Sequence, residues 1–195
     1  SEAEMENLQA KQGRSLFGID MRVVGEHGEE LPWDGKSAGE LQVRGYWVVR
    51  EYFRGDGGDP LVDGWFPTGD VASIDADGFM QITDRSKDVI KSGGEWISSI
   101  DIENIAVSHP AVAMAACIAI SDPKWDERPL LIVALKPGAT AKREELLALY
   151  AGRIPKWWIP DDVLFVDSIP LGATGKILKQ KLRELYGQHR PAAQL

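Results

Sequence analysis

The chain contains little cysteine and little histidine. Its 195 residues include one cysteine and three histidines, so no intramolecular disulfide can form, and we expect no metal site. The single Cys117 lies in the apolar run at residues 115–120, which favours a buried core thiol over a nucleophile. One lone thiol is typical of a reducing compartment, and we expect a cytoplasmic protein.

Long hydrophobic runs, internal repeats and low-complexity tracts are also absent from the sequence. No apolar stretch approaches the length needed to cross a bilayer, and we expect no secretory signal before Gly13. The composition, 44% hydrophobic and 27% charged, is typical of a globular protein. We therefore expect a protein without a transmembrane segment.

Positive charge is scarce in the first part of the chain. The net charge is -8, and residues 1–80 hold sixteen acidic residues against seven Lys and Arg, whereas residues 81–195 hold fourteen against fifteen. The acidic part argues against nucleic acid as a partner. The four Lys and Arg between residues 176 and 183 suit a polyanionic small molecule such as a nucleotide, or a solvated helix face whose cations complement the helix C-terminus.

Hydrophobic periodicity and turn residues predict an α+β fold. The first part is β-rich, with an exposed Gly-rich loop at residues 51–64 and strands at residues 19–24, 40–43, 71–74 and 79–82. Beyond it we expect a small mixed α/β domain whose sheet is covered by helices on its faces. Its predicted strands are residues 112–120, 130–134 and 163–166, and its predicted helices begin after Ser98 and at residues 142 and 177.

A glycine-containing loop near the end of the sequence carries a single lysine. The segment Pro-Leu-Gly-Ala-Thr-Gly-Lys-Ile at residues 170–177 places Lys176 just before the last predicted helix. Gly172 and Gly175 permit a positive φ and a close approach by a ligand, and the ammonium group can follow developing negative charge. A turn with a solvated lysine accounts for the same pattern.

Three further motifs accompany this loop in a fixed order. They are Gly-Glu-Leu-Gln-Val-Arg-Gly-Tyr at residues 39–46, Trp-Phe-Pro-Thr-Gly-Asp at residues 65–70, and the stretch from Asp84 to Ser98. Together they resemble the adenylate-forming superfamily of acyl-CoA synthetases, firefly luciferases and adenylation domains. The sequence Lys-Ser-Gly-Gly-Glu-Trp-Ile-Ser at residues 91–98 most resembles the corresponding motif of fatty-acyl-CoA ligases. The resemblance extends from about Gln12 to about Tyr186.

The resemblance also implies that large parts of such an enzyme are missing from this sequence. The Ser/Thr/Gly-rich loop that holds the pyrophosphate end of ATP and the Tyr-Gly-x-Thr-Glu-like segment are both absent. Residues 1–86 would then be the last, β-rich subdomain of the large AMP-binding domain, and residues 87–195 the small mobile domain. We expect this piece to be inactive without the N-terminal domain of the same chain, and to hold no cofactor tightly.

The resemblance assigns roles to three charged residues. Lys176 stands at the position of the adenylation lysine, Asp70 matches the carboxylate that accepts both ribose hydroxyls, and Arg85 matches an arginine that reaches the nucleotide. A mobile cation suits a reaction in which negative charge develops on acid and phosphate, and an ionised carboxylate suits two donors. A turn residue at Asp70 and a surface ion pair of Arg85 with Asp84 or Asp88 are the simpler explanations.

The resemblance further implies a hinge and a second face. Lys87 falls where the family keeps its hinge residue, about which the small domain would rotate between two poses. After the rotation, the loop with Gly93 and Gly94 would line the channel for the thiol of CoA, since glycine leaves room for a pantetheine chain. Lys91 and Trp96 would belong to this thioester face, although Trp96 suits simple packing equally well. No Gly-x-x-x-x-Gly-Lys-Ser/Thr pattern makes these glycines a phosphate cradle.

The sequence therefore predicts the C-terminal part of an acid-thiol ligase that acts on a fatty or other apolar acid. Such an enzyme forms acyl-AMP from ATP with Mg²⁺ and then acyl-CoA, and its regulation would include a protein acetyltransferase that acts on Lys176. Two alternatives stay open: an adenylation domain that delivers its acyl group to a carrier protein, and a non-catalytic folded module.

Overall fold

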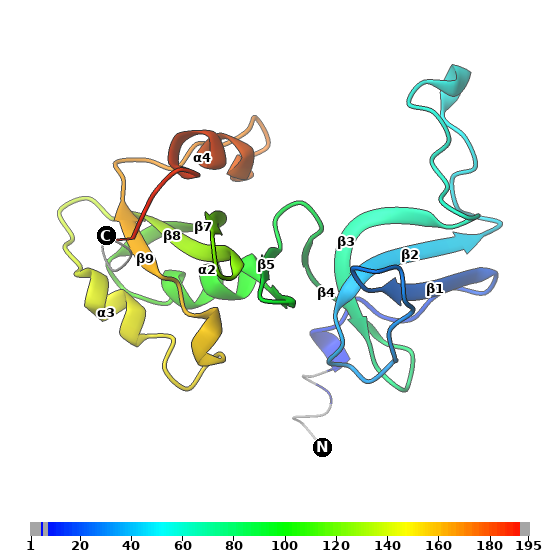
Figure 1. Cartoon of the computed structure of the whole chain (residues 1–195), viewed down its shortest axis with the longest axis horizontal. Coiled ribbons are helices and arrows are strands. Elements are labelled where there is room, and N and C mark those ends of the chain that lie inside the picture. The colour runs from blue at the N-terminus through cyan, green and yellow to red at the C-terminus, as the bar shows by residue number, and fades with distance from the viewer. Residues whose placement is uncertain (1–4, 6–7, 192–195) are drawn as a thin grey trace. The chain divides into compact units, whose positions relative to one another are not determined.

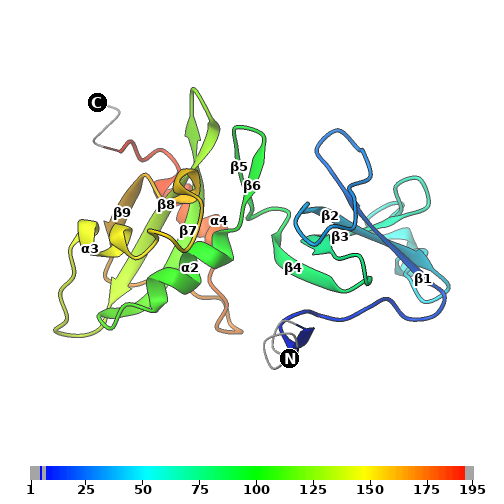
Figure 2. The same cartoon turned by 90° about the horizontal axis from the view of Figure 1, so that it is seen from below.

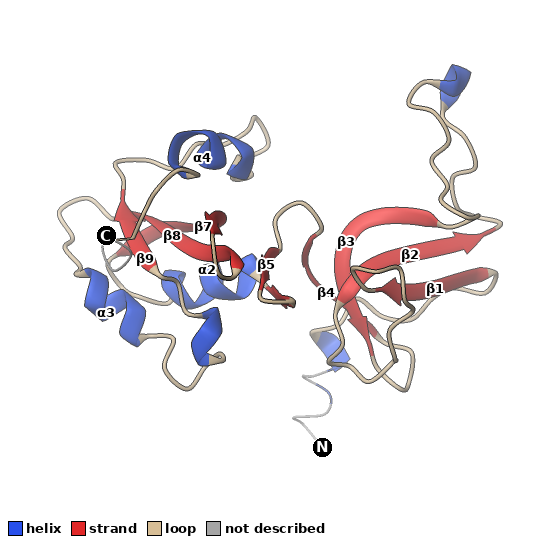
Figure 3. Cartoon of the chain, viewed as in Figure 1, coloured by secondary structure: helices blue, strands red, loops and turns tan. Residues whose placement is uncertain are grey.

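A computed structural model of the chain describes residue 5 and residues 8–191 (Figure 1). The chain divides into two compact units, Ser1–Lys87 and Asp88–Leu195. Figure 3 shows that the first is built almost entirely of strands and loops, whereas the second combines strands with helices. No described helix is long and apolar enough to span a membrane.

The first unit contains an antiparallel sheet of four strands in the order β1-β2-β3-β4. The strands are β1 (Ile19–Val24), β2 (Gly39–Gly45), β3 (Phe66–Ile74) and β4 (Met80–Arg85). The turn between β3 and β4 forms at Asp75, whose Oδ1 accepts the N–H groups of Asp77 and Phe79. These hydrogen bonds reverse the chain direction, so that β4 pairs antiparallel with β3. The four predicted strands are thus present, and the loop at residues 51–64 contains only a single turn of 3₁₀ helix, η1 (Phe53–Gly55).

The second unit contains a sheet of five strands in the order β6-β5-β8-β7, in which β9 pairs with β8 in parallel. The strands are β5 (Ile90–Ser92), β6 (Glu95–Ile97), β7 (Val112–Asp122), β8 (Asp126–Leu135) and β9 (Asp162–Phe165). The hairpin of β5 and β6 was not among the predicted strands, because three residues are too few to display a period of two. Figure 2 shows it beside the tip of β7 and β8, where Ser92 pairs with Asp126.

Three helices and a 3₁₀ turn complete the second unit. They are α2 (Ser99–Val107), α3 (Arg143–Ala148), η2 (Lys156–Trp158) and α4 (Lys179–Tyr186). Ser98 caps α2, because its Oγ accepts the N–H of Asp101 at 3.1 Å. α4 begins two residues later than predicted, because Ile177 pairs with Leu171 and the N–H of Leu178 donates to the carbonyl of Pro170.

Alternate residues of β7 and β8 build two separate cores. Cys117, Leu131 and Val133 face α2 and α3, whereas Ile118, Leu130 and Ile132 face α4, and all six are fully or almost fully buried. Figure 1 shows α4 on one side of β7 and β8, with α2 and α3 on the other. The two faces of one hairpin therefore hold α2, α3 and α4 in place.

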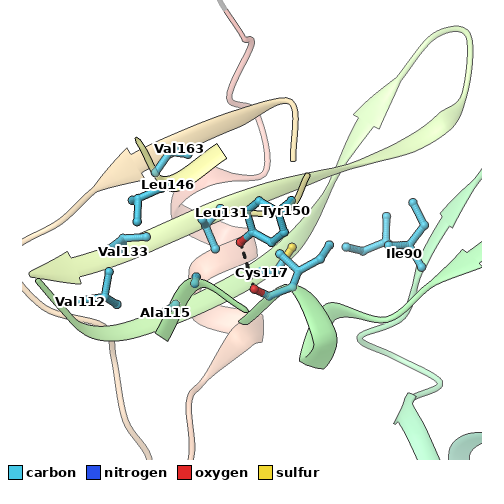
Figure 4. Close-up of a cluster of buried hydrophobic side chains, with 12 residues drawn as sticks. Ile90, Val112, Ala115, Cys117, Leu131, Val133, Leu146, Tyr150 and Val163 are labelled. Carbon is cyan, nitrogen blue, oxygen red and sulfur yellow. Dashed lines mark hydrogen bonds between the residues drawn. The ribbon is translucent and has the colours of Figure 1, made fainter. Parts of the chain in front are cut away.

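The first core, which faces α2 and α3, contains the hydroxyl of Tyr150 (Figure 4). It donates a hydrogen bond of 3.0 Å to the carbonyl of Ile102 in α2, which satisfies both buried groups. Burial raises the pKa of Tyr150 above its ordinary value. The tyrosine thus joins the segment after α3 to α2 in the neutral form.

A cluster of charged side chains surrounds Asp162 at the start of β9. Asp162, at the start of β9, accepts hydrogen bonds from Arg143 on α3 and Val163 N–H, and its Oδ2 lies 2.7 Å from Nε2 of His189. Burial opposes ionisation of Asp162, but the hydrogen bonds from His189, Val163 and Arg143 outweigh it and lower the pKa of this carboxyl group. The cluster ties the segment after α4 to β9 and α3.

We expect Asp162→Asn to lower the free energy of unfolding of the chain by about 1–3 kcal/mol near neutral pH. The reason is that Arg143 and His189 then face a neutral amide in place of a charged carboxylate. A lowered folded pKa means that this contribution is complete above the ordinary value of 3.8 and disappears as the pH falls through the folded pKa. Urea unfolding of both proteins between pH 3 and 7 measures the difference. Asp167→Asn, at an exposed position nearby, is the control and should change stability by less than about 0.5 kcal/mol.

Equal stability losses in Asp162→Asn and Asp167→Asn, or a loss in Asp162→Asn that is as large at pH 3 as at pH 7, would show that the cluster does not act as described.

Candidate functional site

Asp70 and Arg85 lie side by side in the first unit. They are directly paired residues of β3 and β4, and Nε of Arg85 lies 3.0 Å from Oδ1 of Asp70. The side chain of Asp70 is 20% exposed, whereas that of Arg85 is 57% exposed. Arg85 therefore pairs with Asp70 through its side chain, whereas its backbone N–H donates to Oδ1 of Asp84. A carboxylate and a guanidinium group are thus presented together at one point of the sheet.

The turn before Asp70 fixes the position of its carboxylate. Oγ1 of Thr68 donates to the carbonyl of Leu41 at 3.0 Å and accepts the N–H of Asp70 at 3.1 Å. Gly69 has a φ of +76°, a conformation that other residues adopt only under strain, and its carbonyl accepts the N–H of Ser86. The Thr-Gly-Asp sequence thus bonds to strands on both sides and holds Asp70 in one orientation.

Lys176 lies on an exposed loop of the second unit, directly before α4. The N–H of Gly172 donates to the carbonyl of Lys176 at 2.8 Å, and the N–H of Gly175 donates to the carbonyl of Gly172 at 2.9 Å. Gly175 has a φ of +77°, which this tight closure requires. The loop is therefore closed by its own backbone and presents the lysine side chain to solvent.

Gly93 and Gly94 form the turn between β5 and β6, with φ values of +60° and +85°. Such a pair of positive φ values is that of a two-residue hairpin turn, in which glycine is the preferred residue. The N–H of Gly93 donates to the carbonyl of Trp125, and a Cβ at Gly93 would lie 2.9 Å from Cε3 of that indole. Lys91 and Trp96 are opposite each other in this hairpin, with the ammonium group 4.8 Å from the ring centre.

An open cavity of about 1220 Å³ lies beside this turn, within the second unit. Two exposed tryptophans, Trp125 and Trp157, form much of its wall, and Lys124 and Arg190 add positive charge. These residues are not among the site residues that the sequence predicts. The sequence feature that could have indicated this cavity is the pair of tryptophans, because both lie outside the predicted strands and helices, in segments rich in turn residues.

Arg128 is the buried cation of the same cavity. Its guanidinium group donates to both carboxylate oxygens of Asp161, to the carbonyls of Trp157 and Ile159, and to Oγ of Ser92. Because these acceptors use its donors, Arg128 braces the wall and is not the group that meets a ligand. The exposed charged residues of this lining are Lys124, Arg190 and Glu95.

A carboxylate holds the hairpin against the rest of the sheet. Oε2 of Glu127 on β8 accepts the N–H of Lys91 at 2.8 Å. Burial raises the pKa of Glu127 above its ordinary value, although the bond from Lys91 acts in the opposite direction. Among residue 5 and residues 8–191, no group of three or more His, Cys, Asp and Glu side chains could hold a metal ion.

The structure thus brings together Asp70 with Arg85 in the first unit, and Gly93 and Gly94 with Lys91 and Trp96 in the second. Lys176 lies on another loop of the second unit. Lys87 is the last residue of the first unit and is exposed.

Residues 101–176 match the family of AMP-binding enzyme C-terminal domains. This segment of the chain belongs to that family. The match begins in α2 and ends at the exposed lysine, Lys176, so it lies wholly within the second unit. The family and the resemblance noted in the sequence are therefore in agreement.

Known proteins extend this likeness to both units. The chain is 54% identical over 183 residues to 3-methylmercaptopropionyl-CoA ligase of Ruegeria lacuscaerulensis, covering 94% of this chain and 34% of that protein. It is 50% identical over 181 residues to medium-chain-fatty-acid–CoA ligase of Ectopseudomonas oleovorans, covering 93% and 33%. The chain therefore spans about a third of the length of these curated relatives.

Solved structures give the same answer for the fold. The o-succinylbenzoate CoA synthetase MenE of Bacillus subtilis, in complex with the acyl-adenylate intermediate OSB-AMP, is 31% identical with a TM-score of 0.78. The likeness covers 93% of this chain and 37% of that one. The predicted α+β class and the resemblance to adenylate-forming CoA ligases are confirmed.

The two glycines of the β5–β6 turn provide a matched pair of substitutions. Both Gly93→Ala and Gly94→Ala should lower stability by about 1 kcal/mol, since each places a side chain at positive φ. Only Gly93→Ala should also displace the indole of Trp125, because nothing lies within 4 Å of a Cβ at Gly94. Urea unfolding and the NMR resonance of the Trp125 indole N–H measure the two effects. An indole shift of the same size in both variants would contradict this packing.

Proposed function

We propose that the chain is the C-terminal part of an enzyme that joins an apolar carboxylic acid to CoA at the expense of ATP. The observation that carries the proposal is the identity of 50–54% with CoA ligases over more than nine tenths of the chain, across both of its units. In this role the chain supplies nucleotide contacts from the first unit and two functional loops from the second.

In the first half reaction the substrate carboxylate attacks the α-phosphorus of ATP, acyl-AMP forms and pyrophosphate leaves. Negative charge must be stabilised on the attacking oxygen and on the phosphoryl oxygens as the new bond forms. Lys176 is the cation for this step: it is exposed, it lies on a loop closed by its own backbone, and its flexible stem can reach outward. Mg²⁺ accompanies the nucleotide and would be held by parts of the enzyme beyond this chain.

Asp70 and Arg85 bind the AMP portion in this proposal. A carboxylate can accept both ribose hydroxyl groups, and the ion pair with Arg85 orients it for them. Arg85 is the more exposed partner, so its guanidinium group can contact the nucleotide while Nε remains on Asp70. The hydrogen bonds of Thr68 in the Thr-Gly-Asp turn hold the backbone of Asp70 in place for this contact.

In the second half reaction the thiol of CoA attacks the acyl carbon, the thioester forms and AMP leaves. Gly93 and Gly94 line the path of the pantetheine chain in this proposal, and Lys91 with Trp96 shape the same hairpin. The neighbouring cavity is roomy, has aromatic walls and carries Lys124 and Arg190 near its surface, which suits a ligand with both apolar and phosphate groups. CoA is such a ligand, and we prefer it to a carrier protein because the similar proteins are named as CoA ligases.

Lys87 is the pivot between the two half reactions. It is exposed and stands where the two compact units meet along the chain, so a change in its φ and ψ would move one unit as a body. The acyl group is apolar in the relatives' names, which span a short thioether acid and medium-chain fatty acids. We further propose a cytoplasmic enzyme, and an off state in which acetylation of Lys176 by a protein acetyltransferase removes its charge.

Replacement of Lys176 by alanine in the full-length ligase tests the assignment of the first half reaction. The rate of acyl-AMP formation should fall by at least ~100-fold, the scale for loss of one preorganised donor. Thioester formation from supplied acyl-AMP should stay within a few-fold of the parent. Pyrophosphate release and acyl-CoA formation measure the two steps, and Lys181→Ala, an exposed residue of α4, is the control.

An equal loss in both half reactions of Lys176→Ala would contradict a role confined to adenylation. A parent enzyme that releases no pyrophosphate with any apolar carboxylic acid would contradict the proposed function itself.

A further inference from the structure

α4 carries two basic residues on one face, Lys179 and Arg183, one helical turn apart. Leu182 lies beside them and is 1% exposed in the core that faces β7 and β8. Both basic residues form ion pairs with parts of the unit that are far away in sequence. The inward face of α4 is thus fixed by charge as well as by apolar packing.

Arg183 joins α4 to the first residue of the second unit. Its Nη1 lies 2.9 Å from Oδ1 of Asp88, a residue 95 positions earlier in the sequence. The side chains are 29% and 12% exposed, so solvent screens this pair only in part. Val89 and Ile90 follow Asp88 directly and are buried, which fixes the backbone that carries its carboxylate.

Lys179 joins the start of α4 to α2 and to the edge of the sheet. Its Nζ lies 2.7 Å from Oε1 of Glu103 and donates to Oγ of Ser99 at 2.6 Å. The same Oε1 accepts the N–H of Cys117 in β7 at 2.8 Å. Since α2 begins at Ser99, these contacts hold the first turn of α4 against the first two turns of α2.

The two functional loops of the unit are connected to the pivot in different ways. The Gly93 turn follows Asp88 by five residues, and its first strand begins at Ile90, two residues after Asp88. Lys176 is remote from Asp88 in sequence, and its loop leads directly into α4. The ion pair between Arg183 and Asp88 is therefore the short route from the pivot to Lys176, whereas the glycine turn follows the pivot directly along the chain.

We propose that Arg183 is a positioning residue for acyl-AMP formation, because its ion pair with Asp88 makes α4 the rigid link that sets Lys176 relative to the pivot. This inference rests on the proposed function, in which Lys87 is the pivot and Lys176 stabilises the charge of adenylation. Arg183 itself touches no substrate in this account. A small displacement of Lys176 is enough to slow the step, since catalysis by positioning is sensitive to shifts of about 1 Å.

The test compares variants of the full-length ligase in the two half reactions. Arg183→Met and Asp88→Asn should each slow acyl-AMP formation by about tenfold with the KM for ATP within a factor of about two, and should leave thioester formation from supplied acyl-AMP near the parent rate. The reversed pair, Asp88→Arg with Arg183→Asp, should recover most of the lost rate. Lys181→Met removes a cation from the exposed side of the same helix and should leave both rates unchanged.

Thermal unfolding of each variant separates positioning from loss of the fold, and Asp88→Asn retains the shape of the side chain if Arg183→Met unfolds. The inference is overturned if Arg183→Met and Asp88→Asn form acyl-AMP as fast as Lys181→Met, if both half reactions fall equally, or if the reversed pair is no faster than the single variants. A parent enzyme that forms no acyl-AMP overturns the proposed function, and this inference with it.

Discussion

The antiparallel pairing of β7 with β8 is the interaction on which the second unit depends. The ladder runs from the pair Val112 and Leu135 to the pair Asp122 and Asp126, and both faces of it are buried. One face holds α2 and α3, and the other holds α4 with the Lys176 loop before it. The tip of the same hairpin receives the β5–β6 turn. One rigid pair of strands therefore supports both loops to which we assign chemistry, and loss of its packing would move them together.

Charged groups in the chain divide into those that build the fold and those that are presented to solvent. Arg128, Lys179 and Arg183 are partly or largely buried and bonded to carboxylates, so they brace the wall of the cavity and the position of α4. Lys176 is exposed on a loop that is closed by backbone hydrogen bonds from Gly172 to Lys176 and from Gly175 to Gly172. This contrast is the physical basis for regarding Lys176 as the reactive cation: a partnered, buried cation cannot follow charge that develops during a reaction.

Much of the fold could be predicted from the sequence, because long strands show their period and turn residues mark their ends. The strand at residues 19–24 and the helix after Ser98 are examples, the first from alternation and the second from its capping serine. The β5–β6 hairpin was too short to show alternation. The ion pair of Arg85 with Asp70 could not be predicted from the sequence, because Asp70 is distant in sequence and becomes its neighbour only through strand pairing. The cavity with Trp125 and Trp157 depends on tertiary contacts that no local pattern encodes.

The central claim is that one chain serves two half reactions by presenting different faces of its second unit. The most direct measurement is the rate of each half reaction in full-length Lys87→Pro, compared with Lys87→Ala. Proline fixes φ near -65° and removes an N–H, whereas alanine loses only the side chain. The account predicts that Lys87→Pro forms acyl-AMP but makes little acyl-CoA from it, while Lys87→Ala does both. Conversion of acyl-AMP to acyl-CoA by Lys87→Pro at the parent rate would contradict it.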